Sequence, residues 1–129
     1  MNEHSQKYLA KAYDCLEDAD YLLAGNRIEA AANRTYYAIF DAIQALLVNE
    51  NIAAKSHSGT HNKFRELFIK SNIFPIEVNK MLTDSFNMRQ GGDYENDFDL
   101  EKEDIEDVLT QAKKFVKDVE IYLKDDSKN

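Results

Sequence analysis

The amino-acid sequence predicts an all-α fold, an antiparallel bundle of about five helices that forms a single domain over residues 1–129. One proline and four glycines occur among the 129 residues, which leaves few breaks between helices. Apolar residues recur three and four positions apart along most of the chain, as they do on the buried face of an amphipathic helix. The sequence has no segment with the alternating pattern of a strand, no internal repeat and no low-complexity segment.

Two long helices are expected in the first half of the chain. The first covers about residues 5–24, and Gly25-Asn26 then provides a helix stop and a tight turn. The second covers about residues 27–50 and carries apolar side chains on more than one face, which is typical of the centre of a bundle or of a dimer face. Its apolar and small residues are Ile28, Ala31, Ala32, Thr35, Ala38, Ile39, Ala42, Ile43, Leu46 and Leu47.

The second half of the chain predicts three more helices. A shorter one runs from Thr60 to Ser71, started by His57 or Ser58, and the next begins at Pro75, which the first turn of a helix tolerates. Asp99 is suited to cap a long final helix of about residues 100–124, whose early acidic and later lysine residues match the helix dipole. Its inner stripe consists of Ile105, Val108, Leu109, Ala112, Phe115, Val116, Val119 and Leu123.

Composition restricts the location and the partners. The net charge of −8 argues against non-specific affinity for nucleic acid, although lysines and arginines in the middle of the chain leave room for a local basic face. The acidic run Asp93–Asp107 is either a solvated surface or a face that recognises a basic partner. No apolar run is long enough to span a membrane, and a single cysteine, Cys15, fits a reducing compartment. We therefore expect a cytoplasmic protein that does not enter membranes.

Arg34 interrupts the most apolar helix of the chain and needs either a partner or a function. Together with Tyr37 and Asp41 it forms a stripe along that helix, on which small Ala38 and Ala45 leave space for a close partner helix or a pocket. One interpretation is a buried pair of Arg34 with a carboxylate, within the chain or across a dimer. The other is an arginine that binds phosphate through its planar guanidinium. Composition does not separate the two.

Three blocks of sequence resemble the HEPN domains of prokaryotic proteins. They are N-R-T-Y-Y-A-I-F-D-A-I-Q-A-L-L from Asn33 to Leu47, K-S-H-S-G-T-H-N-K-F from Lys55 to Phe64, and R-Q-G-G-D-Y from Arg89 to Tyr94. The resemblance implies a helical bundle that dimerises through its long central helices, here residues 27–50. It also implies one of two roles, because many relatives are metal-independent ribonucleases and others pair with a small nucleotidyltransferase as toxin and antitoxin.

The resemblance further implies where a ribonuclease site would lie. In ribonuclease members an arginine and a following polar residue act with a histidine that is separated from the arginine by four to six residues, in a cleft between two copies. Here Arg34 and Thr35 are present, but Asp41 fills the histidine position. We therefore expect an impaired nuclease that acts as the binding partner of a nucleotidyltransferase in a toxin–antitoxin-like pair; the alternative is an active ribonuclease that uses Arg34. The expected catalytic residues are Arg34 and Asp41, and the expected RNA- or phosphate-binding residues are Arg34, Thr35, Tyr37 and Arg89.

Other polar residues have simpler interpretations. His57 and His61 stand four apart, a spacing that suits a metal site on a helix, but we favour a role of His57 or Ser58 in starting the helix and expect no metal and no cofactor. Arg89 and Asp93 are expected to form a structural pair before the last helix, or else to belong to the cleft of Arg34.

The remaining candidates are apolar in character. Tyr36 and Tyr37 are expected to be core aromatic residues rather than a platform for stacking bases. Cys15 lies on an apolar face and is expected to be a packed thiol rather than a nucleophile.

Overall fold

The computed structural model describes residues 1–90 and 100–126, and these residues form helices joined by short connections. The all-α prediction is confirmed, since no strand occurs in this part of the chain. The helices are α1 (Glu3–Ala24), α2 (Ile28–Asn49), α3 (His57–Phe64), α4 (Ile76–Arg89) and α5 (Lys102–Asp126), and a π-helical turn, Arg65–Ile69, continues α3.

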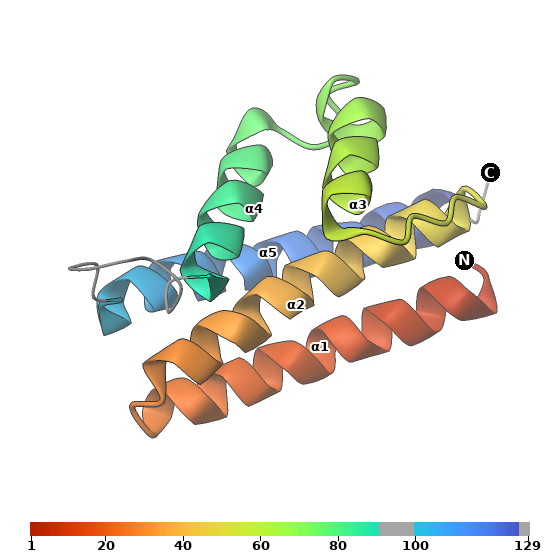
Figure 1. Ribbon diagram of the computed structural model, residues 1–129. Coiled ribbons are helices and arrows are strands. Elements are labelled where there is room, and N and C mark those ends of the chain that lie inside the picture. The colour runs from red at the N-terminus through yellow and green to blue at the C-terminus, as the bar shows by residue number, and fades with distance from the viewer. Residues whose placement is uncertain (91–99, 127–129) are drawn as a thin grey trace.

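The long helices α1, α2 and α5 lie side by side with α2 in the middle, and the shorter α3 and α4 stand steeply against them (Figure 1). Helix α1 is antiparallel to α2, and α3 and α4 also run in opposite directions, whereas α5 returns parallel to α2 (Figure 1). Helix α2 therefore touches every other helix of the bundle, which explains why its apolar residues cover more than one face.

The turn between α1 and α2 forms as the sequence predicts. The amide of Gly25 donates hydrogen bonds to the carbonyls of Tyr21 and Leu22, which ends α1. Asn26 then takes a left-handed conformation with φ of 60°, which asparagine tolerates better than most residues. The chain reverses within a few residues, so α1 and α2 form a tight helical hairpin.

Small residues let α1 approach α2 closely. Ala38 and Ala45 are fully buried, and the hydroxyl of Ser5 on α1 donates a 2.7 Å hydrogen bond to the backbone carbonyl of Ala45. At Ala45, of the two expectations, a close partner helix is therefore the correct one, and that helix belongs to the same chain.

The predicted start of the third helix at Thr60 is wrong. Helix α3 begins at His57, because the side chain of Ser56 caps it by accepting a 2.9 Å hydrogen bond from the amide of Gly59. His57 and Ser58 thus lie inside the helix rather than before it. Helix α4 begins at Ile76, directly after Pro75. The expected cap of the last helix, Asp99, lies outside the described residues.

The core forms where the apolar patterns meet. All eight residues of the predicted inner stripe of α5 are buried, so that prediction is confirmed. Phe115 of this stripe packs against Phe64 and Phe74, with ring centroids 5.8 and 5.4 Å apart, which joins α5 to the α3–α4 half of the bundle.

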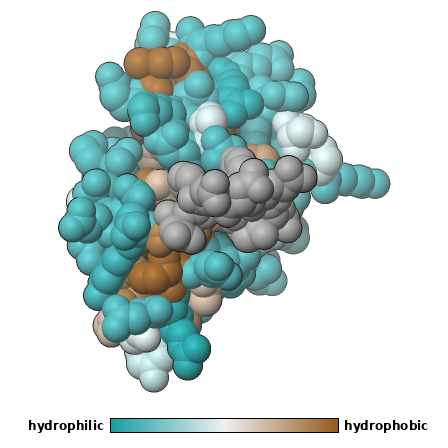
Figure 2. Space-filling view, turned by 60° about the vertical axis from the view of Figure 1, so that its left-hand side comes forward, coloured by the Kyte–Doolittle hydropathy of each residue, from teal (hydrophilic) through white to brown (hydrophobic). Residues whose placement is uncertain are grey.

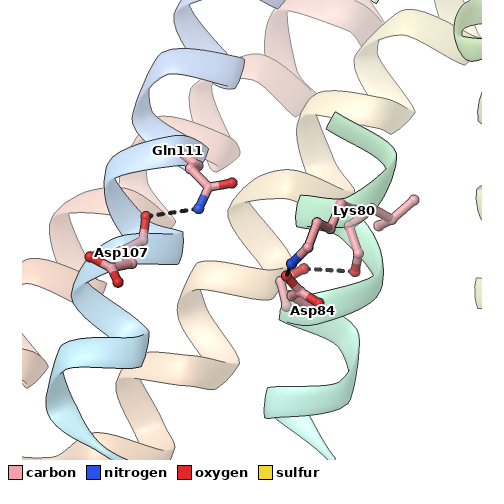
Figure 3. A network of polar contacts seen from close by, with 6 residues as sticks. Lys80, Asp84, Asp107 and Gln111 are labelled. Atoms are coloured by element: carbon pink, nitrogen blue, oxygen red, sulfur yellow. Dashed lines mark hydrogen bonds and ion pairs between the residues drawn. The ribbon is translucent and has the colours of Figure 1, made fainter. Parts of the chain in front are cut away.

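The surface is mostly polar. Seen from the side that is on the left in Figure 1, hydrophobic atoms show mainly at the top, at the height of the α3–α4 connection, and in the lower half (Figure 2). Two exposed isoleucines, Ile73 and Ile76, belong to that connection and to the start of α4. Farther along α4 and on α5 some polar contacts stay within one helix, as between Lys80 and Asp84 and between Gln111 and the carbonyl of Asp107 (Figure 3). None of the described helices is long and apolar enough to cross a membrane.

Candidate functional site

The side chain of Arg34 projects from the half-exposed side of α2, and its contacts are with neutral groups. Its Nε and Nη2 both donate to the side-chain oxygen of Asn33, at 3.1 and 2.8 Å, and Nη1 lies 3.7 Å from the sulfur of Cys15. The guanidinium carbon also sits 5.1 Å from the centre of the Tyr37 ring. In the part of the chain that the structure describes, no carboxylate lies within ion-pairing distance of Arg34.

Arg89, the last residue of α4, reaches the same tyrosine from another helix. Its guanidinium carbon lies 5.3 Å from the ring centre of Tyr37, 5.3 Å from that of Tyr36 and 6.0 Å from that of Phe86. The ring of Tyr37 is therefore in contact with two guanidinium groups, those of Arg34 and Arg89, which come from helices far apart in sequence. Of the predicted RNA- or phosphate-binding residues, these three are brought together. Asp93, the expected partner of Arg89, lies outside the described residues.

Asp41 is separated from Arg34 by a thiol. The sulfur of Cys15 lies 3.9 Å from Oδ2 of Asp41 and 3.7 Å from Nη1 of Arg34, so the intramolecular pair of Arg34 with Asp41 does not form as a direct ion pair. Burial raises the pKa of Asp41 to about 6, although Lys11 and Arg34 act in the opposite direction. Burial also raises the pKa of Cys15, which is a packed, buried thiol as expected.

Thr35 is the one predicted binding residue that is not brought to this cluster. Its side chain is buried, and its hydroxyl donates a 2.8 Å hydrogen bond to the carbonyl of Ala31 one turn earlier in α2. The hydroxyl is therefore used in a hydrogen bond within its own helix and does not point to the arginines.

A second polar group lies beside the arginines, and the sequence did not reveal it. The hydroxyl of Tyr36 is 2.7 Å from Nδ1 of His57 and 2.7 Å from Nε2 of His61. A tyrosine hydroxyl carries one proton, so it donates to one imidazole and accepts from the other. Tyr36 is thus a core aromatic residue, as predicted, but one with a polar function.

Both imidazoles are neutral at pH 7. Burial, with a smaller contribution from Arg89, lowers the pKa of His57, and burial lowers the pKa of His61 to about 4. The four-residue spacing of the two histidines does place them on one face of α3, but that face meets Tyr36. Among the described residues no group of three or more side chains could hold a metal ion. The four-residue spacing could therefore predict that the two histidines lie on one face of a helix. It could not predict that Tyr36 of α2 is their partner.

The two polar groups meet at Tyr37. The ring of His57 lies 5.9 Å from the ring of Tyr37 and is stacked on Phe40 at 4.6 Å. Arg34, Arg89 and His57 thus surround one half-exposed tyrosine, and we call these four residues the Tyr37 cluster.

Comparison with known families matches most of the chain to one family. The family model of the HEPN domain matches residues 5–122, which include every helix that contributes to the Tyr37 cluster. The chain belongs to the HEPN family.

Three relatives cover most of this HEPN chain. A UPF0332 protein of Thermotoga maritima is 33% identical over 128 residues, 97% of both chains. Two proteins of Methanocaldococcus jannaschii carry the name putative toxin. MJ0142 is 31% identical over 118 residues, which cover 92% of this chain and 80% of the relative, and MJ0605 is 30% identical over 125 residues, which cover 97% and 92%.

Chemically, the Tyr37 cluster of this HEPN chain is suited to a phosphate ester that carries an aromatic base. Guanidinium groups donate paired hydrogen bonds to phosphate oxygens, and the half-exposed ring of Tyr37 offers an aromatic contact to a base. The cluster is cationic although the whole chain carries a net charge of −8.

Proposed function

We propose that this protein acts in a toxin–antitoxin-like pair and binds RNA through Arg34, Tyr37 and Arg89. The observation that carries the proposal is the pair of guanidinium groups on one half-exposed tyrosine. Among the described residues neither arginine is ion-paired with a carboxylate. Single-stranded RNA offers both a phosphate for the arginines and a base for the tyrosine.

The proposed partner is a nucleotidyltransferase, as the family resemblance implies. The names of the two Methanocaldococcus jannaschii relatives support a toxin–antitoxin context. The net charge of −8 supports a protein partner with a basic surface, since complementary charge speeds and selects association.

We further propose that the protein is a homodimer and that the contact lies on α2. Most of α2 is buried within its own bundle, and beyond its exposed first turn with Glu29 and Ala30 the surface left for a second copy is mainly a half-exposed stripe. This stripe includes Asn33, Arg34, Tyr37, Phe40 and Asp41. A two-fold contact there would bring together the clusters of the two copies, because an isologous interface places the same residues on both sides.

Asp41 stands at the position where ribonuclease relatives carry histidine, and this substitution argues for an impaired nuclease. With a pKa of about 6, its side chain is mostly ionised at pH 7. A carboxylate repels the phosphate that Arg34 attracts, and it is a weak proton donor in that state. The proposed role therefore depends on binding and does not require Arg34 and Asp41 to cleave RNA.

The RNA-binding part is tested by fluorescence anisotropy with a labelled single-stranded RNA of mixed sequence. Arg34→Ala and Arg89→Ala should each weaken binding about tenfold or more, and raised salt should weaken binding by the wild type. Arg27→Ala is the matched control, because Arg27 is an exposed arginine at the start of α2, away from Tyr37. Equal losses in all three variants would refute the site.

The partner is tested by co-expressing the protein with the products of the genes beside its own, the expected partner being a nucleotidyltransferase, and measuring the mass of the purified species. A stable complex that contains two copies of this chain is the expected result. If the two proteins purify separately, the pairing is contradicted. If the complex contains one copy of this chain, the dimer is contradicted.

The second candidate function is an active metal-independent ribonuclease that uses Arg34. The observation that favours it is the presence of an imidazole, His57, at the same tyrosine as the two arginines. Asp41→His separates the two candidates. Cleavage gained only in that variant supports an impaired site, whereas cleavage by the wild type that is lost in Arg34→Ala supports the ribonuclease.

A further inference from the structure

Helices α4 and α5 form a small hollow that shares no residue with the Tyr37 cluster. Its floor is apolar: Val78 and Met81 of α4 and Phe115 of α5 line it, and Met81 and Phe115 are buried. Its volume is about 170 Å³. Binding pockets for small molecules usually measure about 300–1,000 Å³, so this hollow suits one large apolar side chain rather than a whole ligand.

The hollow lies on the side of α4 that faces away from α3. Asn79 and Thr83 of α4 accept hydrogen bonds from Arg65, at 2.6 and 3.5 Å, so their side of α4 faces the π-helical turn that continues α3. Two residues turn an α-helix by about 200°, so Met81 lies nearly opposite to Asn79 and Thr83. A molecule in the hollow would therefore not need to displace α3.

Carboxylates border the hollow and continue along α5. Glu77 of α4 is exposed, lines the hollow and forms no ion pair among the described residues, and Asp118 of α5 lines it from the other side. Asp107 lies on the same stripe of α5, because the lining residues Gln111 and Lys114 follow it by four and seven residues. We call the hollow and this stripe, from Asp107 to Asp118, the α4–α5 groove.

The lysines at the α4–α5 groove are already paired. Lys80 lies 2.7 Å from Asp84, and Lys114 lies 2.8 Å from Asp118. Figure 3 shows the pair of Lys80 and Asp84 on α4 beside Asp107 on α5. In the part of the chain that the structure describes, exposed Asp107 forms no ion pair, so its charge is not compensated locally.

An exposed apolar residue continues the stripe at its other end. Ile121 is 48% exposed and follows Lys114 by seven residues, which places it on the same side of α5 two turns later. The stripe from Asp107 to Ile121 is about 21 Å long at 1.5 Å per residue, the length of a helix of about 14 residues. It is acidic at one end, hollow in the middle and apolar at the other end.

Charge determines which kind of molecule fits this surface. Uncompensated carboxylates repel RNA, and a second copy of the chain would itself bring a net charge of −8. A basic protein surface is attracted instead, and an amphipathic helix places apolar anchors and basic residues along one groove.

We propose that the α4–α5 groove binds a basic amphipathic helix of a partner protein. One apolar side chain of that helix fills the hollow, and its lysines or arginines meet Glu77 and Asp107. The groove would thus serve the protein partner proposed above, on whose existence the inference rests. Because the groove and the Tyr37 cluster share no residue, the protein should bind this helix and RNA at the same time.

Fluorescence anisotropy with a labelled peptide tests the groove on the full chain. The probe is a helical peptide of about 14 residues with leucines on one face and lysines and arginines beside them. It should bind the wild type and bind less well at raised salt. Peptides with the leucines replaced by alanine, or the basic residues by glutamate, should bind at least tenfold more weakly. The wild type with bound peptide should keep its affinity for RNA.

Four variants with matched positions locate the binding surface. Gln111→Trp should weaken peptide binding about tenfold or more, because the indole covers the hollow, whereas Thr110→Trp at the next position, outside the lining, should not. Glu77→Lys should also weaken binding about tenfold, whereas Glu17→Lys on α1 should not. All four replaced side chains are exposed, so the variants should fold.

The same variants are then measured in the complex obtained by co-expression. Gln111→Trp and Glu77→Lys should lower the recovered complex about tenfold, and the two controls should not. Two results would overturn the groove and leave the proposed pairing intact: a complex that survives both groove variants, or a peptide that the wild type binds no better than these variants do. If the wild type forms no complex with the neighbouring gene products, the proposed pairing fails, and the peptide experiment still decides the groove.

Discussion

Replacing Asp41 with asparagine should stabilise the protein above pH 6 and leave its stability nearly unchanged near pH 4. The folded state raises the pKa of this carboxyl from 3.8 to about 6, mainly through burial. A raised pKa means that the protonated side chain favours folding; this contribution is complete below pH 3.8 and is lost as the pH rises through about 6. Asparagine stays neutral and therefore avoids the loss.

The magnitude follows from the shift. A difference of about two pKa units corresponds to about 3 kcal/mol, at about 1.4 kcal/mol per unit. Because Asp41 is partly exposed, solvent screening reduces the expected gain to about 1–2 kcal/mol, or about 3–8 °C in Tm.

Urea denaturation of the wild type and of Asp41→Asn at about pH 4 and about pH 8 measures this gain. Asp14→Asn is the matched control, because it removes the same charge from an exposed position of α1 and should change stability little at either pH. An equal difference at both pH values would refute the reasoning. So would a loss of stability at pH 8, since it would mean that attraction to Lys11 and Arg34 outweighs burial.

Three further predictions concern stability. Ser56→Ala should lower the free energy of unfolding by about 1 kcal/mol, because it removes the cap of α3, and a change below the error of a urea titration would contradict that role. Ala45→Leu should lower it by about 1–3 kcal/mol, because α1 lies against this position, whereas Ala30→Leu on the exposed side of α2 should not; similar melting temperatures of the two variants would argue against close helix packing. His61 has a folded-state pKa of about 4, so its contribution to stability is present above pH 6.5 and is lost as the pH falls toward 4. The wild type should therefore lose about 2–3 kcal/mol of unfolding free energy between pH 6.5 and 4 that His61→Gln does not lose. An equal loss in the wild type and in His61→Gln would refute this prediction.

The helices could be predicted from sequence because each depends on nearby residues. The inner stripe of α5 and the Gly25-Asn26 turn both follow from local patterns, and both are present in the structure. The error at α3 is also local, since Ser56 caps the helix and the choice between neighbouring serines depends on backbone geometry that the sequence does not contain.

The site was harder to predict because it depends on which helices meet. Arg34 and Tyr37 share a stripe of α2 and could be grouped from their spacing alone. The contact of Arg89 with Tyr37 and the link of His57 to Tyr36 require the docking of α4 and α3, which no spacing encodes. Likewise, the thiol between Arg34 and Asp41 comes from α1.

The tight hairpin of α1 and α2 also has a consequence for the order of folding. Its contacts beside the Gly25-Asn26 turn are close in sequence, and such contacts form quickly because little chain entropy is lost, so the hairpin can close outward from that turn. We therefore expect the hairpin to form early and to carry Arg34 and Tyr37, while His57 and Arg89 arrive only when α3 and α4 dock. The same order predicts that a local opening of α3 and α4 would dismantle the Tyr37 cluster and leave the hairpin folded, so amide hydrogens of α3 and α4 should exchange faster than those of α1 and α2.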